Sequence, residues 1–260
     1  MGEQMINVGD YVTRRSYRHD LVFQVIKKEG NKCILRGVDV RLIADALEDD
    51  LVLSDRRESD DSELFDRISD DINLDRSDYF YIPGVILHLD GDKYFLKRCM
   101  EYYKKANIKA YGKFLKESDM HKEITKYLND INPDVVIITG HDALSKDKKN
   151  LYKNSENFKK TVLEARKYEK SNDNLIIIAG ACQSNYEELI KSGATFASSP
   201  KRINIHALDP SIIATSICLS KKGTIVDLKK LLEKTKYGKD GIGGLVVNGI
   251  MDVGYPRNGE

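Results

Sequence analysis

The sequence predicts an α/β fold in which a mostly parallel sheet is covered by helices on both faces and is preceded by a small β-barrel. Two near-continuous apolar runs, residues 135–138 and 175–178, have the composition of strands that are buried on both faces. Helix-like segments separate such runs, as the crossover connections of a parallel sheet require. Upstream, short strand-like stretches alternate with turn residues between residues 9 and 53, which is typical of a small β domain.

The composition describes a folded chain. Of its 260 residues, 41% are hydrophobic and 32% are charged, and 42 Lys and Arg balance 41 Asp and Glu to a net charge of +1. This balance gives no general reason to expect nucleic acid or an anionic membrane as a partner. No apolar run reaches the roughly 18 residues that suggest a membrane span, and residues 1–5 lack the features of a secretory signal. We therefore expect a soluble, cytoplasmic protein.

The first part of the chain is predicted to contain one domain and one linker. Residues 1–54 are expected to form the β-barrel, of the SH3-like kind, with Gly30 in the turn of a hairpin. Residues 55–78 carry ten acidic residues and four Arg in 24 positions, with few large apolar side chains. Such a segment buries too little surface to fold alone, so we expect a flexible acidic linker with at most a frayed helical turn.

Residues 79–260 are predicted to form the α/β domain, because strands and helices alternate from residue 79 onward. The expected strands cover residues 84–89, 108–111, 135–138, 175–178 and 194–198. The expected helices cover residues 93–106, 118–131, 155–170 and 186–191. Ser118 has the side chain of an N-cap for the helix at residues 118–131, and Pro133 ends that helix. Gly193 ends the helix at residues 186–191.

Two of these strands end in the same way. Residues 135–138 lead through a small residue and Gly140 to His141, and residues 175–178 lead through Ala179-Gly180-Ala181 to Cys182. Sites in open parallel sheets form at the carboxyl ends of the strands. Neighbouring strands lie about 4.8 Å apart, so the imidazole and the thiol are expected within mutual reach. The other three cysteines are expected to be small buried hydrophobes.

This pairing suits nucleophilic catalysis. A free thiol has a pKa of about 8.5 and is mostly protonated at neutral pH, so it needs a base to become a nucleophile. His141 is the predicted base and Cys182 the predicted nucleophile. Backbone N–H groups at the two turns are candidates to hold the oxyanion of the reaction. These oxyanion candidates are Gly140, Gly180 and Ala181.

The His and Cys spacing of 41 residues resembles the caspase-like cysteine proteases, which include clostripain and gingipain types. More of the chain resembles the YabG family of sporulation-specific cysteine proteases. The stretches that carry this second resemblance are residues 9–14, 36–42, 139–143, 179–184, 197–202 and 204–210. One departure from the broader caspase-like pattern is that Gly140 precedes the His, whereas Gly usually follows it.

The resemblance implies a caspase-like sheet and a cysteine endopeptidase that uses a Cys-His dyad. It implies protein substrates, namely spore coat and germination proteins, and no metal ion or organic cofactor. It also implies a protein that acts in the cytoplasm of the sporulating cell and associates with the spore coat. In caspase-like folds, the region after the fifth strand helps to build the substrate pocket.

Several further residues are candidates around the dyad. The expected substrate-pocket residues are Asp142, Gln183, Ser199, His206 and Asp209. Asp142 is also a candidate to orient His141, and His206 is a weaker rival as the base. The Asp209 carboxylate suits a basic substrate side chain, so we expect cleavage after Arg. Self-processing is then expected in the acidic linker, at Arg56, Arg57, Arg67 or Arg76.

Two other functions remain open at this point. The acidic strand end Asp90-Gly91-Asp92, together with Asp142, suggests a Mg²⁺-dependent, Rossmann-like phosphohydrolase. A non-catalytic protein of spore coat assembly is the second alternative. The first predicts metal-dependent activity that survives thiol alkylation, and the second predicts that Cys182→Ala changes no processing event. The matched ends of the His and Cys strands favour a peptidase over both.

Overall fold

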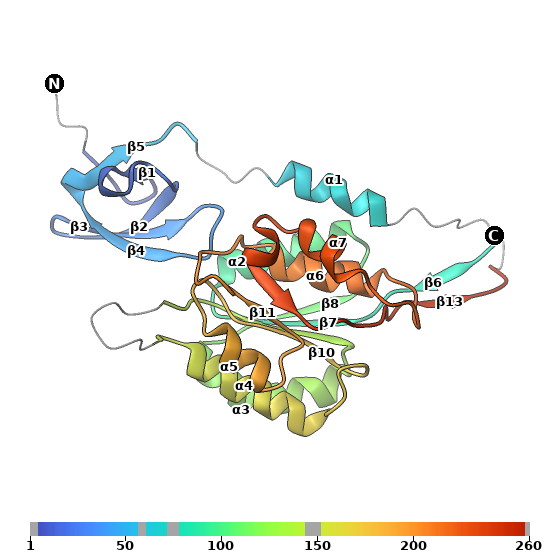
Figure 1. Ribbon diagram of the computed structural model, residues 1–260. Helices are drawn as coiled ribbons and strands as arrows, with labels where there is room; N and C mark the ends of the chain where they lie inside the picture. The colour runs from blue at the N-terminus through green and yellow to red at the C-terminus, as the bar shows by residue number, and fades with distance from the viewer. Residues whose placement is uncertain (1–4, 57–60, 72–77, 144–151, 258–260) are drawn as a thin grey trace. The chain divides into compact units, whose positions relative to one another are not determined.

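The computed structural model describes residues 5–56, 61–71, 78–143 and 152–257. The chain divides into two compact units, Met1–Asp61 and Ser62–Glu260. Figure 1 shows helices and sheets along the chain, and the predicted α/β class is confirmed. In the described part of the chain, no helix is both long and apolar enough to cross a membrane.

The first unit is a five-stranded antiparallel sheet in the order β4-β3-β2-β1-β5. Its strands are β1 (Tyr11–Arg14), β2 (Phe23–Glu29), β3 (Lys32–Gly37), β4 (Ile43–Leu47) and β5 (Leu51–Leu53), with short 3₁₀ turns at Arg15–Tyr17 and Glu48–Asp50. Side chains along β2 and β3 alternate between buried and exposed, as a half-buried strand requires. The buried set, which includes Phe23, Val25 and Leu35, forms a core of its own.

The second unit is built on a six-stranded sheet in the order β12-β11-β10-β9-β7-β8. These strands are β7 (Ile86–Asp90), β8 (Ala110–Phe114), β9 (Val135–Thr139), β10 (Ile176–Ala179), β11 (Phe196–Ser198) and β12 (Ile242–Gly244). The pairs from β8 to β11 are parallel, and β12 runs antiparallel to β11. The central strands β7, β9 and β10 are buried along their whole length, because helices cover both faces.

Helices pack on both faces of this sheet (Figure 1). One face carries α2 (Lys93–Lys105), α6 (Asp209–Cys218) and α7 (Leu228–Glu233), whose side chains share a core with residues of β7, β9 and β10. The other face carries α3 (Glu117–Ile131), α4 (Ser155–Tyr168) and α5 (Tyr186–Lys191) around a second core. The sheet therefore lies in the middle of three layers, with its strand ends at the edges of the layers.

Several elements lie outside the sequence-based expectation, namely α1 (Ser62–Asp71), α6, α7, β6 (Phe80–Ile82), β12 and β13 (Asp252–Gly254). Within the predicted linker, α1 is a ten-residue helix, longer than a frayed turn, and its Leu64 joins the core that contains α2. A short antiparallel ribbon pairs β6, which precedes the six-stranded sheet along the chain, with β13, which follows it. A 3₁₀ turn at Gly238–Asp240 precedes β12.

Candidate active site

His141 and Cys182 follow two neighbouring parallel strands at equivalent positions. In the register of β9 and β10, Ile138 pairs with Ala179. His141 and Cys182 each come three residues after that pair. The turns stay joined beyond the ladder, because the Gly180 N–H donates to the Ile138 carbonyl oxygen at 2.9 Å. The spacing of 41 residues along the chain therefore equals the register offset between the two strands.

His141 is held by polar contacts to its ring and to its backbone. Its Nε2 lies 2.9 Å from Oδ2 of Asp92, and its backbone N–H donates to Oε1 of Glu117 at 2.9 Å. Its carbonyl oxygen accepts a bond from the Asn154 side-chain amide at 2.7 Å. The Phe95 ring meets the imidazole in an edge-on contact, 6.1 Å between centroids. No sequence pattern points to Glu117 and Asn154, which lie 24 and 13 residues from His141 along the chain.

Asp92 occupies the turn between β7 and α2. Its Oδ1 accepts bonds from the backbone N–H groups of Tyr94 at 2.7 Å and Phe95 at 3.4 Å, so it is the N-cap of α2. Its own N–H donates to Oδ1 of Asp90 at 2.9 Å. From the sequence, Asp92 is a predicted ligand of the rival magnesium site. The acidic strand end was the signal for this position, but it does not reveal that His141 is the partner.

Cys182 is completely buried, with 0% of its surface exposed. Its Sγ accepts the Ile205 N–H at 3.3 Å and donates to the Ile205 carbonyl oxygen at 3.8 Å. Two surface depressions, of about 370 and 480 Å³, are lined by other residues and include neither Cys182 nor His141. The segment that contains Ile205 therefore covers the thiol and closes it to solvent in this arrangement.

Asp142 joins the turn after β9 to the turn after β10. Its buried carboxylate accepts the backbone N–H groups of Ala143 at 2.9 Å and Asn154 at 2.7 Å. The other oxygen accepts the hydroxyl of Ser184 at 2.9 Å and that of Ser155 in a short contact. This use of both oxygens differs from the expected contact with substrate or with His141. Asp142 instead fixes the positions of the two turns.

Two of the three oxyanion candidates have N–H groups that hold the turn itself. The Gly180 N–H donates to the β9 backbone, and the Ala181 N–H donates to Oγ of Ser184 at 2.9 Å. Gly140 packs against Glu117, because a Cβ at this position would lie 2.5 Å from Oε1 and would displace that carboxylate. For Gly180 and Ala181, this arrangement differs from the expected oxyanion role.

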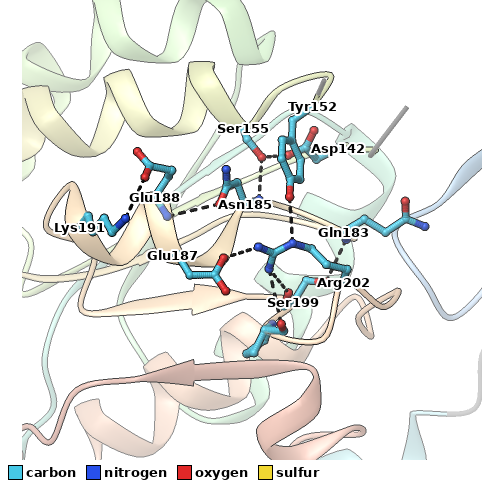
Figure 2. A network of polar contacts seen from close by, with 11 residues as sticks. Asp142, Tyr152, Ser155, Gln183, Asn185, Glu187, Glu188, Lys191, Ser199 and Arg202 are labelled. Atoms are coloured by element: carbon cyan, nitrogen blue, oxygen red, sulfur yellow. Dashed lines mark hydrogen bonds and ion pairs between the residues drawn. The ribbon is translucent and has the colours of Figure 1, made fainter. Parts of the chain in front are cut away.

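Gln183 and Ser199 tie the Cys182 turn to the loop after β11 (Figure 2). The buried hydroxyl of Ser199 accepts the Gln183 N–H at 3.1 Å and donates to the Ile203 carbonyl oxygen at 2.7 Å. The Gln183 side chain donates to Oδ1 of Asn204 at 3.4 Å. Ser199 therefore shapes the loop that covers the thiol, whereas the sequence analysis expects it in an open pocket.

Arg202 also holds the loop after β11 in place. Its guanidinium donates to the Tyr152 hydroxyl at 2.9 Å and to the Ser199 carbonyl oxygen at 3.2 Å, and it forms an ion pair with Glu187 (Figure 2). The ion pair lowers the pKa of the Glu187 carboxyl below its ordinary value. These contacts anchor the loop to α5 and to Tyr152, which lies three residues before α4.

His206 and Asp209 are both buried and bonded to the backbone. Asp209 begins α6, and its carboxylate oxygens accept the His206 N–H at 3.1 Å and the Lys236 N–H at 2.9 Å. His206 Nδ1 accepts the Leu208 N–H at 3.3 Å. In this arrangement neither side chain offers the open contact with a basic substrate residue that the sequence analysis expects.

A buried cluster of His88, Asp90 and Cys99 has the donor types of a metal site. Their ligand atoms all lie within 4.8 Å of one another. Each group also has a partner within the protein. His88 Nδ1 lies 2.8 Å from the Tyr103 hydroxyl, Asp90 accepts from the next turn, and Cys99 Sγ lies 3.7 Å from the Ala207 carbonyl oxygen. Because the three groups have these partners within the protein, the cluster is explained as a buried polar network without a metal ion.

The carboxylates of the proposed magnesium site do not share a set of partners. Asp90 lies beside His88, with 3.5 Å between Oδ2 and Nε2. Asp92 contacts His141, and Asp142 contacts two serines. Mg²⁺ binds through one or two carboxylates with near-ideal octahedral geometry. The separate engagement of the three groups gives no support to the phosphohydrolase interpretation.

Two of the four predicted self-cleavage residues belong to the described chain. Arg56 is exposed after β5 and forms a two-point ion pair with Asp39, with both contacts at 3.0 Å. Arg67 lies in α1 and donates to the Lys234 carbonyl oxygen at 3.2 Å. Arg57 and Arg76 lie outside the described residues. Since peptidases generally take extended chain, Arg56 is better placed for cleavage than the helical Arg67.

The chain is similar to known proteases over nearly its whole length. Residues 7–74 and 62–256 match the family model of the YabG peptidase U57. The Sporulation-specific protease YabG of Bacillus subtilis (strain 168) is 38% identical to this chain over 282 aligned residues. That alignment covers 96% of this chain and 97% of the relative.

Proposed function

The chain belongs to the YabG peptidase U57 family, and from this premise we propose that it is a cysteine endopeptidase with Cys182 as nucleophile and His141 as general base. Membership of this family makes the chain a peptidase and associates it with sporulation. It argues against the phosphohydrolase and the non-catalytic assembly protein as rival functions. The observation that carries the proposal is the equal register of His141 and Cys182 on neighbouring parallel strands.

The proposed reaction is acyl transfer through a thioester. The Cys182 thiol gives its proton to His141, and the sulfur attacks the carbonyl carbon of the scissile peptide. The carbon–nitrogen bond then breaks, and His141 returns the proton to the leaving amine. Water attacks the thioester, with its proton passing to His141, and releases the carboxylate product and the thiol. Because Ile205 covers the sulfur, the segment after β11 moves away before the first step of the proposed reaction.

We further propose that the second unit has the caspase-like arrangement of this enzyme class. The strand order β8-β7-β9-β10-β11-β12, with an antiparallel last strand, supports this proposal. The five-stranded antiparallel sheet of the first unit supports an SH3-like barrel in residues 1–54, with the peptidase domain downstream. Fold similarity does not by itself assign chemistry, so the mechanism rests on the two side chains.

The proposed substrates are proteins of the spore coat and of germination, processed in the sporulating cell, with association of the enzyme with the spore coat. The sporulation-specific protease of Bacillus subtilis supports the setting. The assay is mass spectrometry of coat extracts incubated with wild type and with Cys182→Ala. New protein termini that require Cys182 would support the proposal, and identical termini in both samples would count against it.

The dyad is tested with three proteins that are purified in parallel: wild type, Cys182→Ala and His141→Ala. Each is incubated alone and with peptides that differ only in having Arg, Lys or Asp before the cleaved bond. We expect hydrolysis by wild type and a loss of at least about 10³-fold in either variant, since both residues act in one unit. Equal hydrolysis by all three proteins would contradict the assignment of Cys182 and His141 as a catalytic dyad.

We propose that the enzyme cleaves after Arg and processes its own chain between residues 55 and 80. The exposed position of Arg56 and the Arg-containing, acidic composition of this segment support the proposal. Intact mass measured over time should show trimming of wild type and a stable Cys182→Ala. Arg56→Gln should remove the cut at that residue, and Arg36→Gln serves as the control outside the segment. A wild type that cuts peptides while its own mass stays constant would contradict self-processing.

A further inference from the structure

We propose that Asp92 is the positioning residue for His141 and forms the third member of a Cys182–His141–Asp92 row at the edge of the sheet. This inference rests on the proposed function of the other two residues. Asp92 touches His141 and does not itself meet the reacting atoms. Its role is to fix the orientation of the imidazole and to face the positive charge that forms on it.

The row follows from register. Asp90 pairs with Thr139 in the ladder of β7 and β9, and two further residues lead to Asp92 and His141. Cys182 follows β10, the next strand in the sheet order, at the matching position. Three neighbouring parallel strands therefore place a carboxylate, an imidazole and a thiol in successive positions at one sheet edge. The carboxyl ends of such strands are where sites form.

The contact between Asp92 and His141 is short and shielded. Oδ2 and Nε2 are 2.9 Å apart, and the two side chains are 7% and 17% exposed. An ionised carboxylate only accepts hydrogen bonds, so Nε2 is the donor in this contact. Proton exchange with the Cys182 thiol is then assigned to Nδ1 of the ring. The resulting imidazolium faces a carboxylate that water screens poorly.

Asp92 is immobilised independently of His141. Its other oxygen caps the thirteen-residue helix α2 through two backbone N–H groups, and its own N–H is bonded to Asp90. Glu117 accepts the His141 N–H and also packs against the turn that carries Asp92, because its Oε1 would lie 2.3 Å from a Cβ added at Gly91. The carboxylate is therefore preorganised, which is what a positioning group requires.

Asp92 could be present only as the N-cap of α2, without any role toward His141. The substitution Asp92→Asn distinguishes the capping role from the positioning role. Asn caps helices about as well as Asp and has nearly the same shape, so Asp92→Asn should fold normally. It removes the charge and permits the wrong ring tautomer of His141. Asp227 is the matched control, because it caps α7 through the N–H groups of Lys229 and Lys230 and is exposed.

The test compares wild type, Asp92→Asn, Asp92→Glu and Asp227→Asn on the peptide that wild type cleaves best. In Asp92→Asn we expect kcat to fall about 10²- to 10⁴-fold, with KM within about threefold. Asp92→Glu should recover part of this loss, and Asp227→Asn should match wild type. A kcat of Asp92→Asn within about threefold of wild type overturns the inference. If that variant does not fold, Asp92→Ser, which also caps helices, replaces it.

The ring tautomer of His141, measured without substrate, is a second test of the role of Asp92. In ¹⁵N spectra of the five histidine rings, His141 is identified by its loss in His141→Gln. We expect hydrogen on its Nε2 in wild type and a reduced Nε2–H population in Asp92→Asn, which capping alone would not change. An unchanged tautomer in the Asn variant overturns the inference. Full activity in Cys182→Ala or His141→Ala would instead reject the proposed function, whatever Asp92 does.

Discussion

At the scale of single residues, the backbone of Ile205 governs access to the Cys182 thiol. Ile205 uses both its N–H and its carbonyl group on one sulfur, and its side chain is also completely buried. A buried aliphatic side chain anchors the backbone that carries it. The resting thiol is therefore shielded by backbone that packing holds in place, and exposure of the sulfur needs a local opening of this segment.

Trimming the anchor should expose the thiol. Ile205→Ala removes about 2–4 kcal/mol of packing from the segment, so its open fraction should rise and Cys182 should react with iodoacetamide at least about tenfold faster. Peptide mapping of the alkylated protein measures this rate. Ile124→Ala, a fully buried position in α3, is the control for general loosening. Equal rates in both variants would contradict a role of Ile205 as the cover.

Cys218 gives a prediction about alkaline stability. Burial, and secondly the nearby Asp134 carboxylate, raise the pKa of this thiol well above its ordinary value. The folded protein therefore holds the proton more tightly than the unfolded chain. The resulting stabilisation is complete below the unfolded pKa of about 8.5 and is lost as pH rises toward the folded pKa. We expect Tm to fall between about pH 8 and 10, and to fall less in Cys218→Ala.

Thermal melts of wild type and Cys218→Ala across this pH range measure the difference. Ile213→Val, a buried position in the same helix without a titratable group, is the control and should shift all melts equally. Parallel pH curves of Tm for wild type and Cys218→Ala would show that another group causes the alkaline loss.

The sequence revealed His141 and Cys182 because each ends a strongly apolar strand. It did not reveal the contact of His141 with Asp92, because that contact depends on strand order. The strand β8 lies at the sheet edge, so β7 becomes the neighbour of β9 although β8 comes between them along the chain. Nor did the sequence show that Asp142, beside His141, turns toward serines of two other segments.

At the scale of elements, Asp142 is the junction of the site. Its four hydrogen bonds join the turn after β9, the start of α4 and the turn before α5. Ser155 continues this connection, because its Oγ accepts the Asn185 N–H at 2.8 Å (Figure 2). A buried carboxylate that receives several hydrogen bonds stabilises a fold mainly because its loss leaves those donors unsatisfied.

Asp142→Asn should therefore destabilise the protein. The amide NH₂ replaces one of the two oxygens, each of which accepts two hydrogen bonds, so two of the four donors lose their acceptor and the negative charge is lost. We therefore expect a loss of about 2–4 kcal/mol in the free energy of unfolding, with reduced activity. Urea unfolding at neutral pH measures it. Asp119, whose side chain is 44% exposed and is paired with Lys122 at 2.7 Å, gives the control Asp119→Asn, whose cost should be below about 1 kcal/mol. A similar small cost at Asp142 would contradict its role as the junction.

The sequence predicts a helix where one face of the helix is polar, and it predicts a strand where a short run of residues is apolar. The helices α3 and α4 have buried residues at helical spacing and were expected from their pattern. In contrast, all ten residues of α6 are buried, so the helix has no polar face to reveal its period. Ser118 lies inside α3, which begins at Glu117 after an N-cap at Lys116, so the predicted N-cap was wrong by two residues.

At the scale of the whole molecule, each unit contains a core made from its own residues. The core of the first unit runs from Ile6 to Leu51, and the cores of the second unit begin at Leu64. A chain segment with its own core can in principle fold alone. The break between units, after Asp61, precedes α1, so α1 belongs to the second unit.

The fragment 62–260 should therefore fold and cleave peptides without the first unit. We expect a cooperative melt within about 5 °C of that of the full chain, followed by circular dichroism, together with peptide hydrolysis. A fragment 79–260 is the matched comparison, because it also loses Leu64 and Phe65 from the core. It should be less stable by about 2–3 kcal/mol. Aggregation of both fragments would show that the second unit needs the first to fold.

The register of the sheet also bears on how the chain can be lengthened. Hydrogen bonds across the strands set the alignment of His141 with Cys182, so the number of residues between them is free to change. Asp173 and Asn174 form an exposed turn just before β10, at the end of that strand away from Cys182. Doubling a loop costs only about 0.6 kcal/mol, so an affinity tag spliced there should be tolerated. Such a tag would hold the protein from the strand ends opposite His141 and Cys182.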